Sequence, residues 1–281
     1  MHSGSVFSGR RRRPSDSMNQ HRVAYPTLAR EVVRISDVVL EVLDARFLEK
    51  TRHHAIEGDV AALGKKLVFV INKVDLVDID AVKRLLVKQG MKPYVLVSSV
   101  KRIGKQALKE RIYIEVRRMN VAHATAHIGI IGYPNTGKSS LINYLAGTKA
   151  ASTSAQAGHT RGIQKIKLAK GLFLLDTPGV IPDTEYKAPV RDDIKKHTEI
   201  GVKTYDTMKD PEFVVARLLQ EHLGLLEDFY GIAAAGDAEV LLETLGKRHH
   251  LLKKGGTVDQ ERAARLVLKA WQEGKIHPQS A

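Results

Sequence analysis

The chain has 281 residues, no cysteine and a formal net charge of +14 at pH 7. Without cysteine it forms neither disulfides nor thiolate sites for zinc or redox chemistry, and no apolar run reaches the roughly 18 residues that would suggest a membrane span. The positive charge favours RNA over a membrane surface as partner, and we expect one or two domains in the reducing cytoplasm.

The first 20 residues are rich in Ser, Gly, Arg and Pro, with four arginines at positions 10–13, which predicts a flexible basic arm. From Pro26 onward the apolar residues become periodic. Helical patterns occupy 27–35, 79–89, 104–118 and a segment from Lys138, and strand patterns occupy 37–44, 66–71, 92–98, 127–131, 163–169 and 172–175. This alternation predicts an α/β domain over residues 21–188 with a mostly parallel, doubly wound sheet.

The strand patterns stop near residue 190, and residues 189–281 are predicted to form a small all-α domain. Asp210 and Asp237 precede helical patterns as expected N-caps, and Pro211 follows the first of them. In the last pattern, DQERAARLVLKAWQ, an apolar stripe predicted to be core lies beside a basic face of Arg262, Arg265 and Lys269. We interpret this basic face as a surface for RNA.

The segment GYPNTGKSS, residues 132–140, follows a strand pattern and opens a helix, which is the context that a phosphate loop requires. Its glycines let backbone N–H groups surround phosphates, and the helix N-terminus adds a favourable dipole. Lys138 is expected to reach the β- and γ-phosphates, and the Ser139 hydroxyl to ligate Mg²⁺. The other predicted nucleotide contacts of this segment are Asn135, Thr136, Gly137 and Ser140.

Two later segments supply the rest of a predicted triphosphate site. FLLDTPG places Asp176 at the end of an apolar strand, where its carboxylate can hold Mg²⁺ through a water, while the N–H of Gly179 can meet the γ-phosphate. Thr160, in the intervening AGHTRG, is the hydroxyl expected to complete the Mg²⁺ shell. Lys138, Thr160 and Gly179 are therefore the predicted catalytic groups.

The tetrapeptide Asn72-Lys73-Val74-Asp75 ends a strand pattern and precedes the phosphate loop in the chain. As a guanine-recognition loop, it would let Asp75 accept from N1–H and the exocyclic amine, which adenine does not present. Lys73 would then cover the base, and Asn72 would tie the loop to the phosphate side. The alternative is a turn that caps the next helix.

A second base loop is predicted at Ser99-Val100-Lys101, which follows the strand pattern at 92–98 and whose backbone N–H would meet guanine O6. Ligands of open α/β sheets lie beyond the carboxyl ends of the strands, so these loops can share one pocket in any chain order. The order base motif, second base loop, phosphate loop, Thr160 segment and D-T-P-G then indicates a circularly permuted GTP-binding domain.

With Asp44-Ala45-Arg46 at the end of the strand pattern at 37–44, this order resembles the circularly permuted ribosome-assembly GTPases (the YlqF/RbgA family) over nearly the whole chain. The resemblance implies hydrolysis of GTP to GDP with Mg²⁺, and binding to the large ribosomal subunit precursor. It also implies that the C-terminal domain contacts rRNA. We expect a monomer away from the ribosome.

The resemblance extends to three details of catalysis. Val180 stands where many GTPases have a water-orienting glutamine, which implies a low intrinsic rate. Asn135 matches an asparagine that holds K⁺ in cation-activated relatives, and the alternative is a loop residue that tolerates an unusual backbone angle. His21 falls at the place of a water-positioning histidine, but its neighbours MNQHRVAY differ from the family's, and a surface histidine is the alternative. Arg46 and Arg161 are interpreted as structural ion-pair residues.

Two other functions stay open at this point. One is a nucleotide-regulated RNA-binding module with negligible hydrolysis, which turnover measured with and without large subunits and K⁺ would distinguish. The other is an ATP-binding enzyme built on the same phosphate loop, which Asp75→Asn would test through nucleotide preference.

Overall fold

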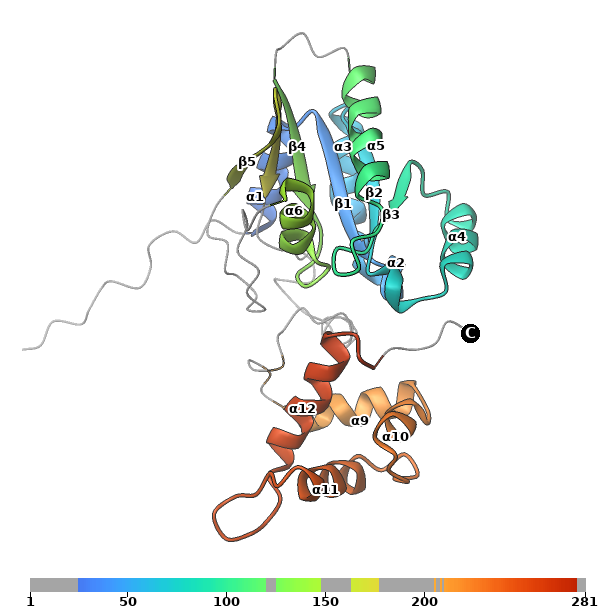
Figure 1. Ribbon diagram of the computed structural model, residues 1–281, viewed down its shortest axis with the longest axis vertical. Helices are drawn as coiled ribbons and strands as arrows, with labels where there is room; N and C mark the ends of the chain where they lie inside the picture. Colours follow the sequence, from blue (N-terminus) through green and yellow to red (C-terminus); the bar gives the residue numbers. More distant parts are fainter. Residues whose placement is uncertain are drawn as a thin grey trace, which may run out of the picture.

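The computed structural model describes residues 25–119, 125–147, 163–176 and 210–276, together with residues 205 and 208. These residues form an α/β domain with a central sheet and a separate helical domain. The helical domain lies beyond the carboxyl ends of the parallel strands (Figure 1). The following predictions lie outside the described residues: the basic arm, the domain boundary at 188–189, His21, Thr160, Arg161, Gly179 and Val180.

The sheet of the α/β domain has the strand order β3-β2-β1-β4-β6-β5. Its strands are β1 (Val38–Asp44), β2 (Lys66–Asn72), β3 (Tyr94–Leu96), β4 (Ala126–Ile131), β5 (Gln164–Ala169) and β6 (Leu172–Asp176). All pairings are parallel except that of β5 with β6. The predicted α/β class and mostly parallel sheet are therefore confirmed.

The strand predicted over 92–98 is shorter than expected, since β3 spans only Tyr94–Leu96. Pro93 has no N–H to donate to a neighbouring strand. Ser98 pairs with Ile103 across a turn instead of continuing the parallel ladder.

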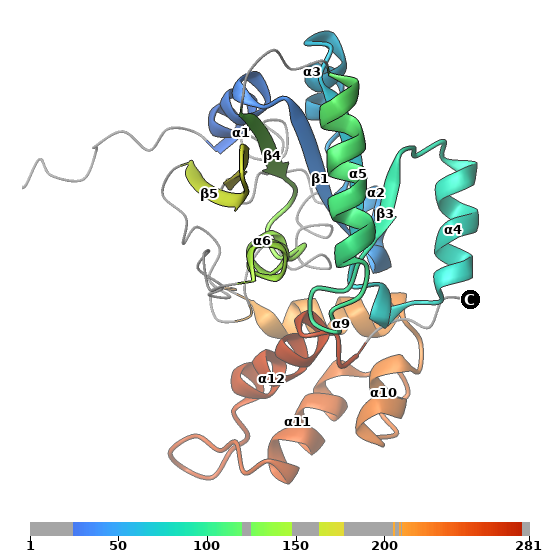
Figure 2. The same ribbon diagram turned by 45° about the horizontal axis from the view of Figure 1, so that its top comes forward.

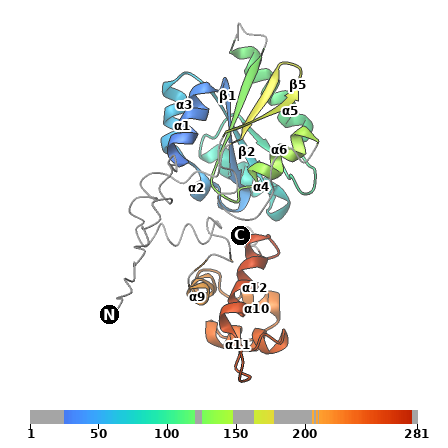
Figure 3. The ribbon, with the colours of Figure 1, turned by 90° about the vertical axis from the view of Figure 1, so that its left-hand side faces the viewer.

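Helices cover both faces of the sheet because its strands are apolar on both sides. On one face α1 (Tyr25–Ile35), α3 (His54–Ala62) and α4 (Ile79–Lys88) pack on residues such as Val39 and Leu43. On the other face α5 (Lys105–Arg118) and α6 (Lys138–Ala146) pack on Leu40 and Val42. Figure 3 shows α1 and α3 on the opposite side of the strands from α5 and α6.

Two short helices and α3 were not predicted from the sequence. Only Ile56 and Val60 of α3 are buried, so its apolar pattern is weak, and its start is fixed by the ring of His53, which accepts from the Ile56 N–H. The helix α2 (Leu48–Thr51) has four residues, and α10 (Leu225–Tyr230) has six. Elements this short carry little periodic signal.

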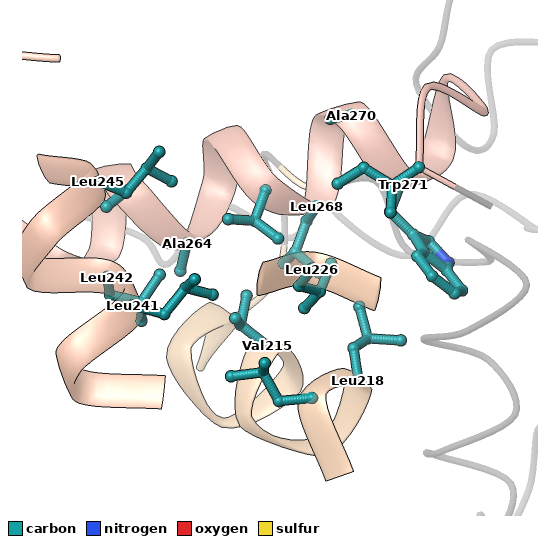
Figure 4. Packing of buried hydrophobic residues seen from close by; sticks show 14 of the residues in the cluster. Val215, Leu218, Leu226, Leu241, Leu242, Leu245, Ala264, Leu268, Ala270 and Trp271 are labelled. Atoms are coloured by element: carbon teal, nitrogen blue, oxygen red, sulfur yellow. The ribbon is translucent and has the colours of Figure 1, made fainter. Parts of the chain in front are cut away.

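The helical domain consists of α9 (Pro211–Glu221), α10, α11 (Ala238–Arg248) and α12 (Gln260–Gln272) around a shared apolar core. Figure 4 shows this core, with Trp271 at one end of the row that α12 contributes. Asp237 caps α11 as predicted, since its carboxylate accepts from two backbone N–H groups. The cap predicted at Asp210 is wrong in its bonding: the residue precedes α9, but its side chain accepts no capping bond from the described residues.

Candidate nucleotide-binding site

The predicted nucleotide loops follow the carboxyl ends of the parallel strands. β1 and β2 are in register so that Asp44 lies beside Asn72, and β4 and β6 so that Ile130 lies beside Asp176. Because these strands are parallel, their carboxyl ends lie on the same side of the domain. That side faces the helical domain in Figure 2. The base motif, the phosphate loop and Asp176 therefore converge despite their order in the chain.

The side chain of Asn72 joins three of the converging segments. Its amide nitrogen donates to the carbonyl oxygen of Thr136 at 2.9 Å, and its amide oxygen accepts from the N–H and hydroxyl of Ser99 at 3.2 and 3.1 Å. The residue is buried. One side chain thus connects the base motif, the second base loop and the phosphate loop.

A glycine allows the close approach of Asn72 to the phosphate loop. A Cβ placed on Gly137 would lie 2.2 Å from the amide nitrogen of Asn72, and the φ of Gly137 is +97°. Other residues would be strained by this backbone conformation as well as by the contact. The glycine required by the phosphate-loop pattern therefore also leaves room for the Asn72 side chain, which connects the phosphate loop to the base motif.

Lys73 provides a second link between the base motif and the phosphate loop. Its ammonium donates to the carbonyl oxygen of Asn135 at 2.7 Å and to the carboxylate of Asp44 at 2.6 Å. Burial lowers the pKa of Lys73 and the charge of Asp44 opposes that shift. Burial also disfavours ionisation of Asp44, but the charges of Lys73 and Arg46 hold its pKa well below the usual range.

Asp75 and Lys101 occupy exposed positions at the base end of the site. The following helix α4 is capped by Asp78, whose carboxylate accepts from the Asp80 N–H at 2.9 Å. The alternative for Asn72–Asp75 was a turn that caps the next helix. In the structure Asp78, and not a residue of 72–75, caps that helix. Val100, the centre of the second base loop, is 79% exposed.

The phosphate loop holds Lys138 in a buried position at the start of α6. The Lys138 ammonium donates to the carbonyl oxygen of Tyr133 at 2.6 Å, and the Thr136 hydroxyl donates to the same oxygen at 2.9 Å. Burial lowers the pKa of Lys138 to about 8, and the nearby charge of Asp176 opposes the shift. An anionic phosphate at this position would favour the charged ammonium.

Asn135 has a left-handed backbone with φ 60°, and its carbonyl oxygen accepts from Lys73. This geometry agrees with the alternative of a loop residue that tolerates an unusual backbone angle. Ser139 lies half-buried in the first turn of α6, and Asp176 is buried at the end of β6. Oxygen donors of this kind, next to a phosphate site, fit a magnesium ion.

Three residues near this site were not predicted to have a role there: Asp44, Leu76 and Tyr133. Asp44 holds Lys73, and the Arg46 guanidinium binds Asp44 at 2.7 Å, so the interpretation of Arg46 as an ion-pair residue is confirmed. The sequence did contain a signal for Asp44, because this residue ends the strand pattern at 37–44, just as Asn72 follows the strand pattern at 66–71. No local pattern marks Tyr133, whose side chain belongs to the apolar core of the helical domain and whose ring centroid also lies 6.1 Å from that of His53.

Of the basic face predicted on α12, Arg262 and Lys269 are exposed, whereas Arg265 is bonded within the chain. Arg265 donates to the carbonyl oxygens of Tyr205 and Met208 and pairs with Glu261. Lys269 lies over the Tyr205 ring. None of the helices in the described ranges is long and apolar enough to cross a bilayer.

Comparison with known proteins gives matches over most of the chain. Residues 127–223 match the family model of the 50S ribosome-binding GTPases. The uncharacterized GTP-binding protein MJ1464 of Methanocaldococcus jannaschii is 33% identical over 261 residues, which cover 92% of this chain and 68% of that protein. Nucleolar GTP-binding protein 2 of Yarrowia lipolytica is 33% identical, over 88% of this chain and 48% of its own length.

The chain spans about half the length of its eukaryotic curated relatives. Among solved structures, GDP-bound YlqF of T. maritima is 26% identical with a TM-score of 0.61, over 87% of this chain and 93% of YlqF. GNP-bound YlqF from the same organism is 25% identical with a TM-score of 0.60.

Proposed function

The chain belongs to the circularly permuted family of GTP-binding proteins that includes MJ1464 and YlqF, and from this premise we propose that it hydrolyses GTP while acting in assembly of the large ribosomal subunit. The observation that carries the nucleotide part is the bond from Asn72 to the carbonyl of Thr136, which joins a guanine motif to a phosphate loop. The ribosomal part is supported by the matched family model and by the charge of +14.

Specificity for guanine is proposed to depend on Asp75, with the backbone of Ser99, Val100 and Lys101 meeting O6. Asp75→Asn tests this, because an amide at that position would accept the base of xanthine nucleotides better than guanine. We expect GTP affinity to fall at least about 100-fold while XTP affinity rises. Unchanged GTP affinity, or a preference for ATP in the unaltered protein, would contradict the base assignment.

In the proposed reaction, the N–H groups of residues 135–140 and the Lys138 ammonium stabilise charge that develops on the phosphate oxygens. Mg²⁺, held by Ser139, Thr160 and Asp176, would supply further positive charge when bound. The Gly179 N–H would meet the γ-phosphate. Because Val180 replaces the usual glutamine, we propose a low intrinsic rate, with His21 or an activating partner positioning water. In this proposal, K⁺ near Asn135 supplies the counter-charge.

Contact with RNA is proposed to involve the loop after α11 rather than the face of α12. This loop, residues 249–254, exposes His249, His250, Lys253 and Lys254, and the two lysines have no acidic partner among the described residues. Exposed unpaired cations neutralise phosphates without first breaking an ion pair. Lys253→Glu with Lys254→Glu should reduce co-sedimentation with large subunits. The matched control is Lys88→Glu with Lys92→Glu, two exposed lysines that also have no ion pair with an acidic residue in the described ranges.

The GTP-bound state is proposed to favour the ribosome and the GDP-bound state to favour release, because the helical domain follows the D-T-P-G segment in the chain. Pelleting with large subunits in a GTP analogue and in GDP tests this switch. Equal association in both states would remove it.

A second candidate is a nucleotide-regulated RNA-binding module with negligible hydrolysis, which the presence of Val180 favours. Phosphate release measured with and without large subunits and K⁺ separates the two functions. Three relatives are named nucleolar proteins, so a cytoplasmic location is not a property of the family as a whole. For this chain the cytoplasm, and a monomeric state away from the ribosome, are parts of the proposal.

A further inference from the structure

The C-terminal end of α12 contacts the α/β domain at the loops that form the nucleotide site. The first contact is with the base motif. A Cβ placed on Gly274 would lie 2.4 Å from a terminal methyl of Leu76, which directly follows Asp75. The end of α12 therefore packs against the loop that carries the guanine-binding carboxylate.

The second contact is a chain of charged hydrogen bonds. The Arg46 guanidinium donates to the carbonyl oxygen of Trp271 at 3.1 Å and binds the carboxylate of Asp44 through two nitrogens. Asp44 in turn binds Lys73, whose ammonium also holds the phosphate loop. The side chains of Arg46 and Asp44 are 3% and 2% exposed, so this ion pair is shielded from water and from screening by salt.

The third contact is made by the phosphate loop itself. The Tyr133 ring is fully buried, and it belongs to the apolar core of α9–α12 rather than to the cores that flank the sheet. Phe47 joins the same core, with its ring centroid 6.2 Å from that of Trp271. The carbonyl oxygen of Tyr133 meanwhile accepts from Lys138, so one residue links the helical core to the phosphate-binding lysine.

We propose that the end of α12 is a component of the nucleotide site, in which Arg46, Leu76 and Tyr133 act as positioning residues that couple guanine-nucleotide binding to docking of the helical domain. Phosphates that draw Lys138 away from the Tyr133 carbonyl change the bonding of a residue that is anchored in the helical core. Coupling between two such events is reciprocal: the factor by which docking of the helical domain changes nucleotide affinity is also the factor by which nucleotide changes the docking equilibrium. This inference rests on the proposed function only in taking guanine nucleotide as the ligand.

The single tryptophan of the chain provides a probe of the junction in the unaltered protein. Trp271 is buried there, and the ring centroid of His222 lies 5.0 Å from its own. We expect unlabelled GDP to change the emission of Trp271 along a saturable curve. Its midpoint should equal the Kd from competition with a fluorescent nucleotide. A merely structural role of the junction would leave the emission unchanged at saturation.

A matched pair of glycine variants perturbs the junction directly. Gly274→Ala places a methyl group against Leu76, whereas Gly236→Ala, in the same domain, meets no atom within 4 Å. Their φ angles are +75° and +80°, so both carry the same backbone strain. We expect Gly274→Ala to weaken GDP binding about fivefold or more, and Gly236→Ala to stay within about twofold of the unaltered protein.

Arg46→Lys is the second variant, because lysine keeps the charge but lacks the fork that binds Asp44 and the Trp271 carbonyl together. It should weaken GDP binding and reduce the emission change. If the unaltered protein binds GDP without any change in Trp271 emission, or if both glycine variants bind GDP equally well, the coupling is disproved while the proposed function stands. If the unaltered protein binds no guanine nucleotide, the proposed function fails, and the coupling with it.

Discussion

Lys73 at the base end of the site is partly buried and Lys138 at the phosphate end is buried, and the two lysines differ in their partners. Lys73 has a carboxylate at 2.6 Å and a carbonyl oxygen at 2.7 Å. Lys138 has the carbonyl oxygen of Tyr133 at 2.6 Å, and burial lowers its pKa to about 8. The base end is therefore assembled by the protein's own charges, whereas the phosphate end holds a cation whose natural partner is an anionic ligand.

This difference shows how a permuted chain can keep a functional site. The base motif and the phosphate loop have no short connection along the chain; the parallel strands bring them together, and side-chain bonds from Asn72 and Lys73 link them. Preformed bonds at the base end reduce the ordering cost of binding. The Lys138 charge, which burial disfavours, would then contribute affinity for a triphosphate.

The largest effects are expected from replacing the two lysines by methionine. Lys73→Met leaves Asp44 buried with one cation fewer, which should destabilise the fold by roughly 3–5 kcal/mol. Lys138→Met removes a buried cation that is disfavoured by burial, so the free energy of unfolding at pH 7 should rise by roughly 3 kcal/mol. Urea unfolding without nucleotide measures both changes.

The same pair should rank in a different way for binding. Lys138→Met should weaken GTP binding about 100-fold, because a charge-assisted phosphate contact is lost, yet guanosine binding should change little. Lys73→Met should weaken both ligands, since the base loop itself is loosened. If both variants lose stability equally, the contrast between the two ends of the site is wrong.

Two carboxylates of β1 repeat the comparison on a smaller scale. Asp44 has two cationic partners, whereas Glu41 accepts from the His53 N–H at 2.7 Å and its other carboxylate oxygen has no partner among the described residues. Burial, together with the charge of Glu57, raises the pKa of Glu41 to about 8. Buried carboxylates on one strand thus have opposite shifts of pKa, according to their partners.

Glu41 should therefore make stability depend on pH. Between pH 4.5 and 8 the unfolded chain has lost this proton and the folded chain keeps it, so the free energy of unfolding falls as pH rises. Glu41→Gln should remove that fall and stabilise the protein at pH 8 by roughly 3–5 kcal/mol. A fall of the same size in the variant would contradict the role of Glu41. Asp80→Asn, at an exposed position, is the control.

The joint between the two ends can be broken at a single glycine. Gly137→Ala places a methyl group 2.2 Å from the Asn72 amide, whereas Gly147→Ala, at the other end of α6, meets nothing within 4 Å. Their φ angles are +97° and +75°, so both variants carry backbone strain. We expect GDP affinity to fall about tenfold in the first, through one lost hydrogen bond, and to change little in the second. Equal GDP affinities of the two variants would show that the hydrogen bond from Asn72 to Thr136 does not position the phosphate loop.

The motifs that could be predicted from the sequence are those fixed by local pattern. Apolar β-branched runs predicted the sheet, and glycines at set spacing predicted the loop at 132–137, because both depend on neighbours along the chain. The burial of Tyr133 in the helical core, the Arg46 bond to Trp271 and the contact of Gly274 with Leu76 depend on how two domains meet. No periodicity reports that arrangement.

The smallest expected effect is a proton taken up at the phosphate end. In the free protein Lys138, with its pKa lowered to about 8, is about half protonated at pH 8, and a bound phosphate favours the charged form. GDP binding at pH 8 should therefore take up about half a proton, and less at pH 7, where Lys138 is already charged. Calorimetry in two buffers of different ionisation enthalpy measures this uptake.

Lys138→Met should abolish the Lys138 share of the uptake, and the lost uptake distinguishes this lysine from Lys73. Lys73 is paired with the Asp44 carboxylate in the protein without nucleotide, and we expect this pair to persist, so the protonation of Lys73 should not change on binding. The free energy of unfolding should correspondingly rise with pH between 8 and 10.5, where the unfolded chain binds the proton that the folded chain has lost. If Lys138→Met shows the same proton uptake and the same rise, the charge awaiting a ligand lies elsewhere in the site.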